Sequence, residues 1–229
     1  MTTGWRISQA ESRRRYLEKF DTAEVDSYDA LVGTLAPDDE AAYRADLARV
    51  YAFRAGQSIL DAGAGSGALA QVLGGVGGLA ISTLEPAPAM LARLRGKPSL
   101  AEVVAVEGFC DHADDRRHFG AASFDAVFSR QLANGLYDPL AAFHNWFHWL
   151  KPGGAVVLID GLYGRNAWTG RWEEEVDALP LSACQTSATV PYLLEAAGFR
   201  VNAVERMAQV NARPSTRTTR YVVVATKVP

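Results

Sequence analysis

The sequence predicts an α/β fold with a doubly wound, mostly parallel sheet, an antiparallel C-terminal strand and helices on both faces. In the middle of the chain, short apolar runs alternate with helix-compatible stretches, which is typical of a parallel sheet covered on both sides. The first run leads directly into alternating glycines and a second helical stretch. With 229 residues and 48% hydrophobic composition, the chain is long enough for one large domain.

The N-terminal part predicts two helices. Ser8 and Glu11 have the spacing of a capping box, so we expect an exposed helix that runs to Lys19. A second helix is expected after Pro37 and before Gly56, because apolar residues there share one stripe. That stripe consists of Tyr43, Leu47, Val50 and Tyr51.

The sheet is predicted from apolar runs bounded by turn residues. The expected parallel strands cover 58–61, 79–85, 102–106, 124–129 and 155–160. We expect right-handed crossovers between them. A polar, tryptophan-bearing stretch then resembles a lid, and a helix is expected over 191–197. Two last strands, 200–207 and 221–226, are expected to pair as an antiparallel hairpin.

Composition and charge narrow the possible partners. The formal net charge of −3 gives no large field for nucleic acid or anionic lipid, so small or neutral partners are favoured. The N-terminus has no signal-peptide core, and no apolar run has membrane-spanning length, which predicts a cytoplasmic protein. Cys110 and Cys184 have no CxxC spacing, and His144 and His148 lack the glutamate of a zinc-protease motif, so no metal site is predicted.

The basic residues near the C-terminus admit two interpretations. A nucleic-acid surface is conceivable, but interleaved aromatic residues are missing, so a solvated face is favoured. These residues are Arg200, Arg206, Arg213, Arg217, Arg220 and Lys227.

The glycine turn after the first strand predicts a ligand site. Gly63, Gly65 and Gly67 let bare backbone approach a ligand, although the spacing also fits a dinucleotide turn. Glu85 at the end of the second strand is placed to accept both hydroxyl protons of a ribose. Asp61 would repel a pyrophosphate but suits a cationic amino-acid tail. The three features together favour an adenosyl ligand with a positively charged tail.

With these residues in view, the region from about 58 to 161 resembles the class I S-adenosylmethionine-dependent methyltransferases, in their small-molecule, type 11 and type 25-like branch. The resemblance includes Ser123–Ser129 as fourth strand and the Leu150–Gly154 turn before the fifth. It implies a Rossmann-like fold, S-adenosylmethionine as cofactor and S-adenosylhomocysteine as product. The cofactor-binding residues that it implies are Asp61, Gly63, Gly65, Gly67, Glu85, Pro86, Met90, Phe109, Cys110, Asp111, Ser129 and Gln131.

The adenine-binding residue stays open between two alternatives. The family normally places an Asp in the third-strand loop, but here the order of residues departs from that pattern by about two positions. Either Asp111 contacts the adenine amino group, which we favour slightly, or Phe109 and Cys110 supply backbone and apolar contact. Asp111 could equally be a solvated loop carboxylate.

The acceptor is expected to lie against the loops that follow the fourth and fifth strands. Candidate acceptor residues are Arg130, Asn134, Tyr137, Tyr163, Trp168 and Trp172. Arg130 and Tyr163 are the candidate catalytic residues, although methyl transfer needs positioning more than a dedicated base. The aromatic residues could clamp a flat ring or a cation, or simply pack the lid.

The sequence therefore predicts one methyltransferase domain over 1–229, with N-terminal helices at 1–56, a cofactor-binding core at 57–160, an acceptor-side lid at 161–190 and a C-terminal helix and strands at 191–229. The predicted reaction is N-, O- or C-methylation of a small molecule, without nucleic acid or membrane as partner. One alternative is an NAD-dependent oxidoreductase, disfavoured by Asp61 and by the lack of a Tyr-x-x-x-Lys pair. The other is a non-catalytic S-adenosylmethionine-binding partner of another enzyme.

Overall fold

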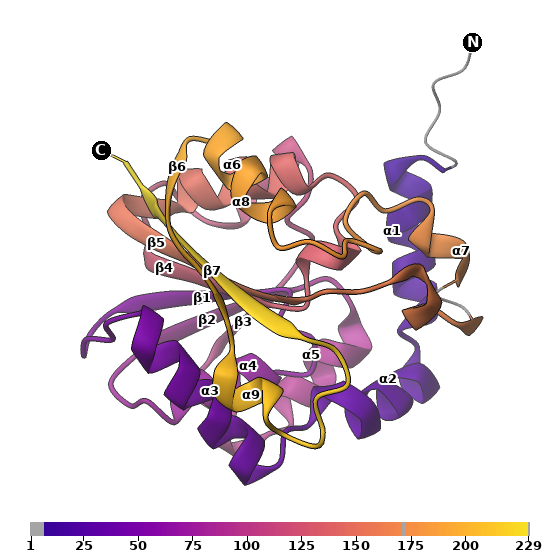
Figure 1. The fold of residues 1–229 in the computed structure, drawn as a ribbon, viewed down its shortest axis with the longest axis horizontal. Helices are drawn as coiled ribbons and strands as arrows, with labels where there is room; N and C mark the ends of the chain where they lie inside the picture. The colour runs from indigo at the N-terminus through magenta and orange to yellow at the C-terminus, as the bar shows by residue number, and fades with distance from the viewer. Residues whose placement is uncertain (1–6, 171–172, 229) are drawn as a thin grey trace.

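A computed structural model of the chain describes residues 7–170 and 173–228. These residues form a seven-stranded sheet in the order β3-β2-β1-β4-β5-β7-β6 (Figure 1). The strands are β1 (Ser58–Ala62), β2 (Ala80–Glu85), β3 (Val104–Glu107), β4 (Phe124–Arg130), β5 (Leu150–Gly161), β6 (Phe199–Arg206) and β7 (Arg220–Lys227). β1 to β5 are parallel, and β7 lies antiparallel between β5 and β6. The predicted fold class is confirmed.

Helices cover both faces of the sheet, because successive strand residues point to opposite sides. Leu60 packs with Trp146 and Leu194 on one face, whereas Ile59 packs with Leu47 and Leu73 on the other. The first face is covered by α6 (Pro139–Trp149) and α8 (Thr189–Ala196). The second is covered by α3 (Pro37–Val50), α4 (Ala68–Gly74) and α9 (Ala208–Asn211), with α5 (Pro88–Arg95) beside them (Figure 1).

The remaining helical elements are short or lie at the edges of these layers. They are α1 (Gln9–Lys19), α2 (Thr22–Tyr28), the π-helix η1 (Asp29–Gly33), the 3₁₀ turns η2 (Pro98–Leu100), η3 (Ala113–His118), η4 (Ala133–Gly135) and η5 (Arg165–Ala167), and α7 (Glu173–Val176). The sequence did not predict α2 or η1, because segments of 7 and 5 residues are too short for a periodic pattern to emerge.

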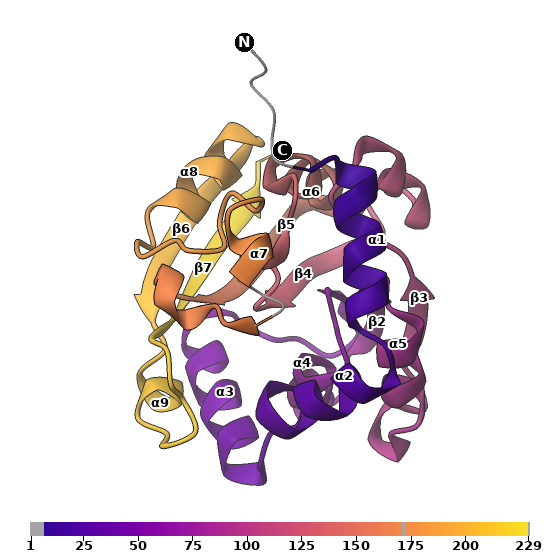
Figure 2. The same cartoon turned by 90° about the vertical axis from the view of Figure 1, so that its right-hand side faces the viewer.

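The N-terminal helix α1 ends at Lys19 as predicted, but it is less exposed than predicted. Ser8 caps α1 by accepting a hydrogen bond from the Glu11 backbone N–H (3.2 Å), as the capping spacing indicates. We expected an exposed helix, but α1 runs across the open end of the sheet (Figure 2), and both Lys19 and the adjoining Phe20 are buried. The helix is therefore exposed on one side only, because its other side packs on loops that are distant in the sequence.

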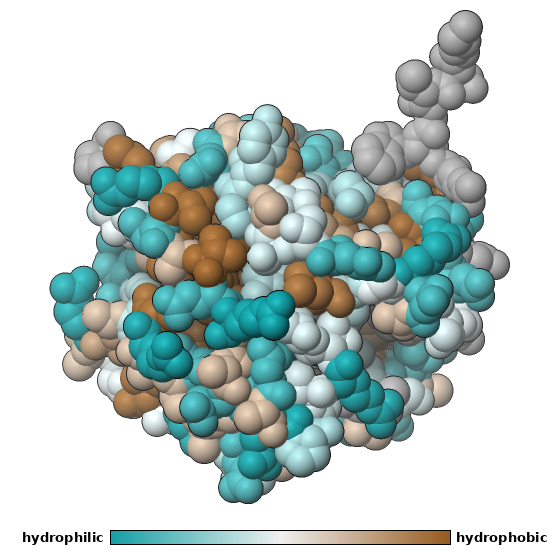
Figure 3. Space-filling view, in the orientation of Figure 1, coloured by the Kyte–Doolittle hydropathy of each residue, from teal (hydrophilic) through white to brown (hydrophobic). Residues whose placement is uncertain are grey.

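β5 also starts earlier than predicted. Leu150 already pairs with Phe124, and the strand continues through the turn at Gly153 (φ +74°) before Ala155 pairs with Ala126. Within the described residues, no helix has the length and apolarity needed to cross a bilayer. The face shown in Figure 3 mixes hydrophilic and hydrophobic residues, with the hydrophobic ones in separate groups.

Candidate cofactor and acceptor site

A cavity of about 360 Å³ lies at the carboxyl ends of the parallel strands, where β1 adjoins β2 on one side and β4 on the other. Ligands of doubly wound sheets bind at such a point, where the strand order reverses. The volume lies within the range of about 300 to 1,000 Å³ that is typical of small-molecule sites.

The glycine turn after β1 brings bare backbone to this cavity. Gly63, Gly65 and Gly67 have φ values of +69°, +55° and +93°, which favour glycine. Gly63 and Gly65 line the cavity. Gly67 precedes α4, and a Cβ there would lie 2.6 Å from Leu100 Cδ1, so this glycine allows close packing instead.

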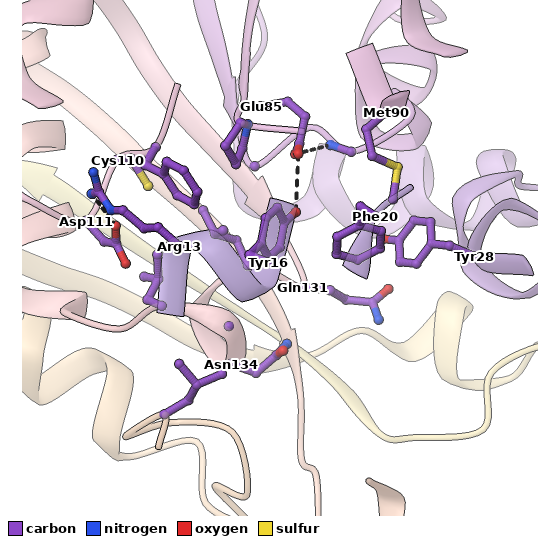
Figure 4. Close-up of a pocket in the computed structure, with 18 of the residues that line it drawn as sticks. Arg13, Tyr16, Phe20, Tyr28, Glu85, Met90, Cys110, Asp111, Gln131 and Asn134 are labelled. Carbon is purple, nitrogen blue, oxygen red and sulfur yellow. Dashed lines mark hydrogen bonds and ion pairs between the residues drawn. The ribbon is translucent and has the colours of Figure 1, made fainter. Parts of the chain in front are cut away.

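The Glu85 carboxylate lies beside the turn, at the end of β2. Its Oε2 accepts a hydrogen bond from the Gly65 N–H (3.0 Å), and its Oε1 accepts bonds from the Ala87 N–H (2.9 Å) and the Tyr16 hydroxyl (3.2 Å). In Figure 4 the Tyr16 side chain of α1 points toward Glu85. Burial raises the Glu85 pKa to about 7, although these three hydrogen bonds oppose the shift.

Asp61 lies deeper than predicted. Its side chain is fully buried and does not line the cavity, and neither carboxylate oxygen accepts a hydrogen bond of good geometry. Burial raises the Asp61 pKa to about 8, while Arg130 and the Ala70 N–H act in the opposite direction. Ser129 is likewise buried outside the cavity lining. The cofactor contacts expected of Asp61, Gly67 and Ser129 stay predictions.

The third-strand loop joins the cavity to α1. The two oxygens of Asp111 accept hydrogen bonds from Arg13 Nη2 (2.8 Å) and from the Tyr137 N–H (3.0 Å). Arg13 also donates to both oxygens of Asp115 (2.5 and 3.3 Å), and its guanidinium lies 4.5 Å from the centre of the Phe109 ring. Asp111 therefore anchors the N-terminal helix; it also lines the cavity, and its contact with the adenine amino group stays a prediction. The other predicted cofactor residues that line the cavity are Pro86, Met90, Phe109, Cys110 and Gln131.

The N-terminal helices contribute an aromatic wall that the sequence analysis missed. Tyr16 of α1, Phe20 directly after α1 and Tyr28 of α2 line the cavity. The ring centroids are 4.8 Å apart for Tyr16 and Phe20 and 5.7 Å apart for Phe20 and Tyr28. The spacing of Arg13, Tyr16 and Phe20 on one side of the predicted helix was the available signal.

Loops after β4 and β5 form the opposite end of the cavity. Gln131 has a left-handed backbone (φ +57°), and its Nε2 donates to the Tyr163 hydroxyl oxygen (2.9 Å). Arg130 donates from Nε to the Tyr43 hydroxyl (3.2 Å). Asn134 donates to Asp160 from both its backbone N–H (3.0 Å) and its Nδ2 (2.8 Å). Arg130, Gln131, Asn134 and Tyr163 all line the cavity.

Burial raises the Tyr163 pKa above its usual value, although Arg220 opposes the shift, so the hydroxyl keeps its proton at neutral pH. Arg220 Nη1 donates to the same hydroxyl oxygen. We assigned Arg220 to a solvated basic face; that interpretation was wrong, because its side chain is buried against Tyr163. Residue type alone could not reveal this, since β7 inserts between β5 and β6 only in the folded sheet.

The remaining acceptor candidates that the structure describes, Trp168 and Tyr137, have different positions relative to the cavity. Trp168 lines the cavity, packs 5.6 Å from the Tyr163 ring centroid and donates from Nε1 to the Ser182 carbonyl (2.8 Å). Tyr137 does not line the cavity; its hydroxyl donates to the Ile7 carbonyl (3.0 Å) and thus holds the start of α1. Trp172 lies outside the described residues. Within the described ranges, no group of three or more His, Cys, Asp or Glu side chains could hold a metal ion.

Comparison with known proteins adds to this geometry. Residues 60–158 match a family model described as a methyltransferase domain. The chain is 41% identical to phosphoethanolamine N-methyltransferase 1 of Arabidopsis thaliana over 44 residues. These 44 residues are 19% of this chain and 9% of the Arabidopsis protein.

Two of the solved structures that share the fold illustrate the similarity. One is phosphoethanolamine N-methyltransferase 2 of Haemonchus contortus in complex with phosphomonomethylethanolamine and S-adenosylhomocysteine (TM-score 0.70, 18% identity, 97% of this chain and 61% of that one). The other is an S-adenosylmethionine-dependent methyltransferase of Aquifex aeolicus (TM-score 0.65, 18% identity, 92% of this chain and 100% of that one). The chain thus spans less than two thirds of the Haemonchus protein and 9% of its Arabidopsis relative. Residues 60–158 thus match a methyltransferase domain, and the chain shares the fold of these two methyltransferase structures.

Proposed function

We propose that this chain transfers the methyl group of S-adenosylmethionine to a small-molecule acceptor bound in the same cavity. The observation that carries this proposal is the Glu85 carboxylate, which is buried at the end of β2 beside the bare backbone of Gly65 and faces the cavity. A carboxylate next to a glycine turn can hold both hydroxyls of a ribose.

The residues present fit the cofactor. Glu85 is buried yet lines the cavity, and Gly65 leaves open space there, because a Cβ at that position would have no neighbour closer than 3.8 Å. Asp61, buried without a hydrogen bond of good geometry, would gain stabilisation from a cationic group nearby. Met90 and Phe109 offer apolar surface to an adenine ring.

S-adenosylmethionine supplies an electrophilic methyl group on a sulfonium. Held by Glu85 and by the backbone of Gly63 and Gly65, it would supply this methyl group to a lone pair of the acceptor and leave as the neutral thioether, and the acceptor would release a proton. The cavity would hold the acceptor beside the methyl group, and such positioning is the main acceleration available to a displacement of this kind. Tyr163 and Arg130 serve as positioning groups, because Tyr163 is protonated and a guanidinium stays charged.

Calorimetric titration of the protein with S-adenosylhomocysteine and, separately, with NADH tests the cofactor. We expect binding of the first alone; binding of NADH without S-adenosylhomocysteine would instead support an oxidoreductase. A labelled methyl donor offered with a panel of small amines, phenols and acids then tests the transfer. Labelling that requires a second added protein would support a non-catalytic partner.

A further inference from the structure

We propose that Tyr163 binds an anionic oxygen group, a carboxylate or a phosphate, on the methyl acceptor, and that Arg220 positions the Tyr163 hydroxyl for this contact. The inference rests on the proposed methyl transfer and names the substrate class of the acceptor end. Neither the predicted acceptor set nor the similarity to known folds assigns a role to Arg220.

The hydrogen bonds at Tyr163 fix the direction of its proton. The hydroxyl oxygen accepts one bond from Arg220 Nη1 and one from Gln131 Nε2 (2.9 Å). Both partners are N–H donors, so they occupy the two acceptor positions of the oxygen and leave its own O–H to donate elsewhere. Since Tyr163 lines the cavity, that donor is available to a molecule bound there.

The local charge favours an anion over a neutral carbonyl group. The Arg220 guanidinium lies 5.4 Å from the Tyr163 ring centre, and Arg130 also interacts electrostatically with Tyr163. The carboxylate of Asp160 opposes them, but its oxygens already accept hydrogen bonds from Asn134 and from the Gly161 N–H (2.7 Å). Asp61, which also interacts with Arg130, has a pKa raised to about 8 and is therefore largely protonated at neutral pH. The two guanidinium groups then outweigh the Asp160 carboxylate at this end of the cavity, and a positive field selects anionic ligands.

Gln131, which donates a hydrogen bond to Tyr163, is itself held in a defined backbone conformation. Gln131 has a left-handed backbone (φ +57°), which is rare for a residue with a side chain and is over-represented at functional sites. Its backbone N–H donates to the Ile159 carbonyl (2.8 Å), which fixes that conformation. Gln131 Oε1 is buried and has no hydrogen-bond partner among the described residues.

Calorimetry on the full chain saturated with S-adenosylhomocysteine tests the proposal with matched probes. Phosphoethanolamine is compared with ethanolamine, and 2-aminobenzoate with 2-aminobenzamide. We expect at least one anionic probe to bind about tenfold or more tightly than its neutral partner, as a charge-assisted hydrogen bond allows. The responding pair decides between phosphate and carboxylate. Equal binding within both pairs, or no binding of either anion, overturns the inference.

Variants of Tyr163 and Arg220 distinguish a loss of anion binding from a loss of folding. Tyr163→Phe should abolish the preference for the anion, and Arg220→Gln should reduce it about tenfold, whereas Arg220→Lys should keep part of it. Arg217→Gln, the same charge change at an exposed position three residues away, should leave the preference unchanged. S-adenosylhomocysteine affinity serves as the folding control for each variant. An unchanged preference in Tyr163→Phe contradicts the proposal, while failure of S-adenosylhomocysteine to bind the wild-type chain removes the proposed function itself.

Discussion

The two ends of the cavity are constructed in different ways. At the cofactor end, Gly63, Gly65 and Glu85 follow neighbouring parallel strands, and backbone hydrogen bonds hold them. At the acceptor end, Tyr163 lies in the loop after β5 and Arg220 begins β7, and the two meet through side-chain contacts. The cofactor end therefore depends on strand order and glycine geometry, whereas the acceptor end depends on how separate segments pack.

The largest effect is expected at a glycine of the cofactor end. Gly67→Ala places a side chain at φ +93° and within 2.6 Å of Leu100, so unfolding free energy should fall by about 2 to 4 kcal/mol. Urea unfolding measures the change. Gly77→Ala is the control, because Gly77 also has a positive φ (+80°) but a Cβ there would have no atom within 4 Å. This variant should lose only the part of the unfolding free energy that comes from backbone strain. Equal losses in both variants would show that packing at Gly67 is unimportant.

Glu85→Ala should weaken S-adenosylhomocysteine binding by about 1 to 3 kcal/mol, through lost charge-assisted hydrogen bonds. Titration calorimetry measures the affinity. Glu107→Ala is a matched control, because Glu107 pairs with Glu85 in register on the next strand but is exposed. If the Glu85 variant binds as tightly as the control, Glu85 does not belong to the cofactor end.

Arg13→Ala tests whether the N-terminal helix belongs to the cavity. The change leaves Asp111 and Asp115 without their guanidinium, and it should cost about 1 to 2 kcal/mol of stability, reduced by the water that reaches this partly exposed arginine. Amide exchange in α1 should accelerate, and cofactor affinity should fall with it. Arg14→Ala, which removes only exposed ion pairs, should leave exchange unchanged. The same exchange rate in both variants would refute the anchoring role of Arg13.

Acidic pH should weaken cofactor binding gradually. Glu85 and Asp61 have raised pKa values of about 7 and 8 in the folded chain, and a cofactor with ribose hydroxyls and a cationic tail favours their ionised forms. Binding should therefore release protons, and affinity should fall by up to about tenfold per group for each pH unit below its pKa. Calorimetry in buffers of different ionisation enthalpy measures the released protons. A pH-independent affinity between 6 and 8.5 would contradict this expectation, and Glu85→Gln should flatten the profile.

The same raised pKa values affect stability with a defined sign. A carboxyl whose folded pKa lies above its unfolded value binds its proton more tightly in the folded state, so that contribution is present at low pH and is lost as pH rises through about 7 to 8. Without cofactor, Asp61→Asn should accordingly gain stability relative to the wild type above pH 8. Thermal unfolding at pH 6 and pH 9 measures the difference.

Much of the cofactor end could be read from local sequence. The glycine spacing of the first turn and the acidic residue that ends the second strand both depend on neighbours in the chain, and the structure brings Gly63, Gly65 and Glu85 to one cavity. The depth of Asp61 was not predictable in this way, because an end-of-strand position does not tell whether a side chain faces the cavity or the helix layer beside it.

The sequence by itself determined the doubly wound sheet and the glycine backbone that faces the cavity, since hydrophobic periodicity and glycine geometry act over a few residues. Only the tertiary structure decided that α1 covers the cavity through Arg13 and Tyr16, and that Arg220 supports Tyr163. These contacts join residues 57 to 98 positions apart. Such pairs leave no periodic signal in either segment, because the free energy that stabilises them arises only when distant surfaces meet.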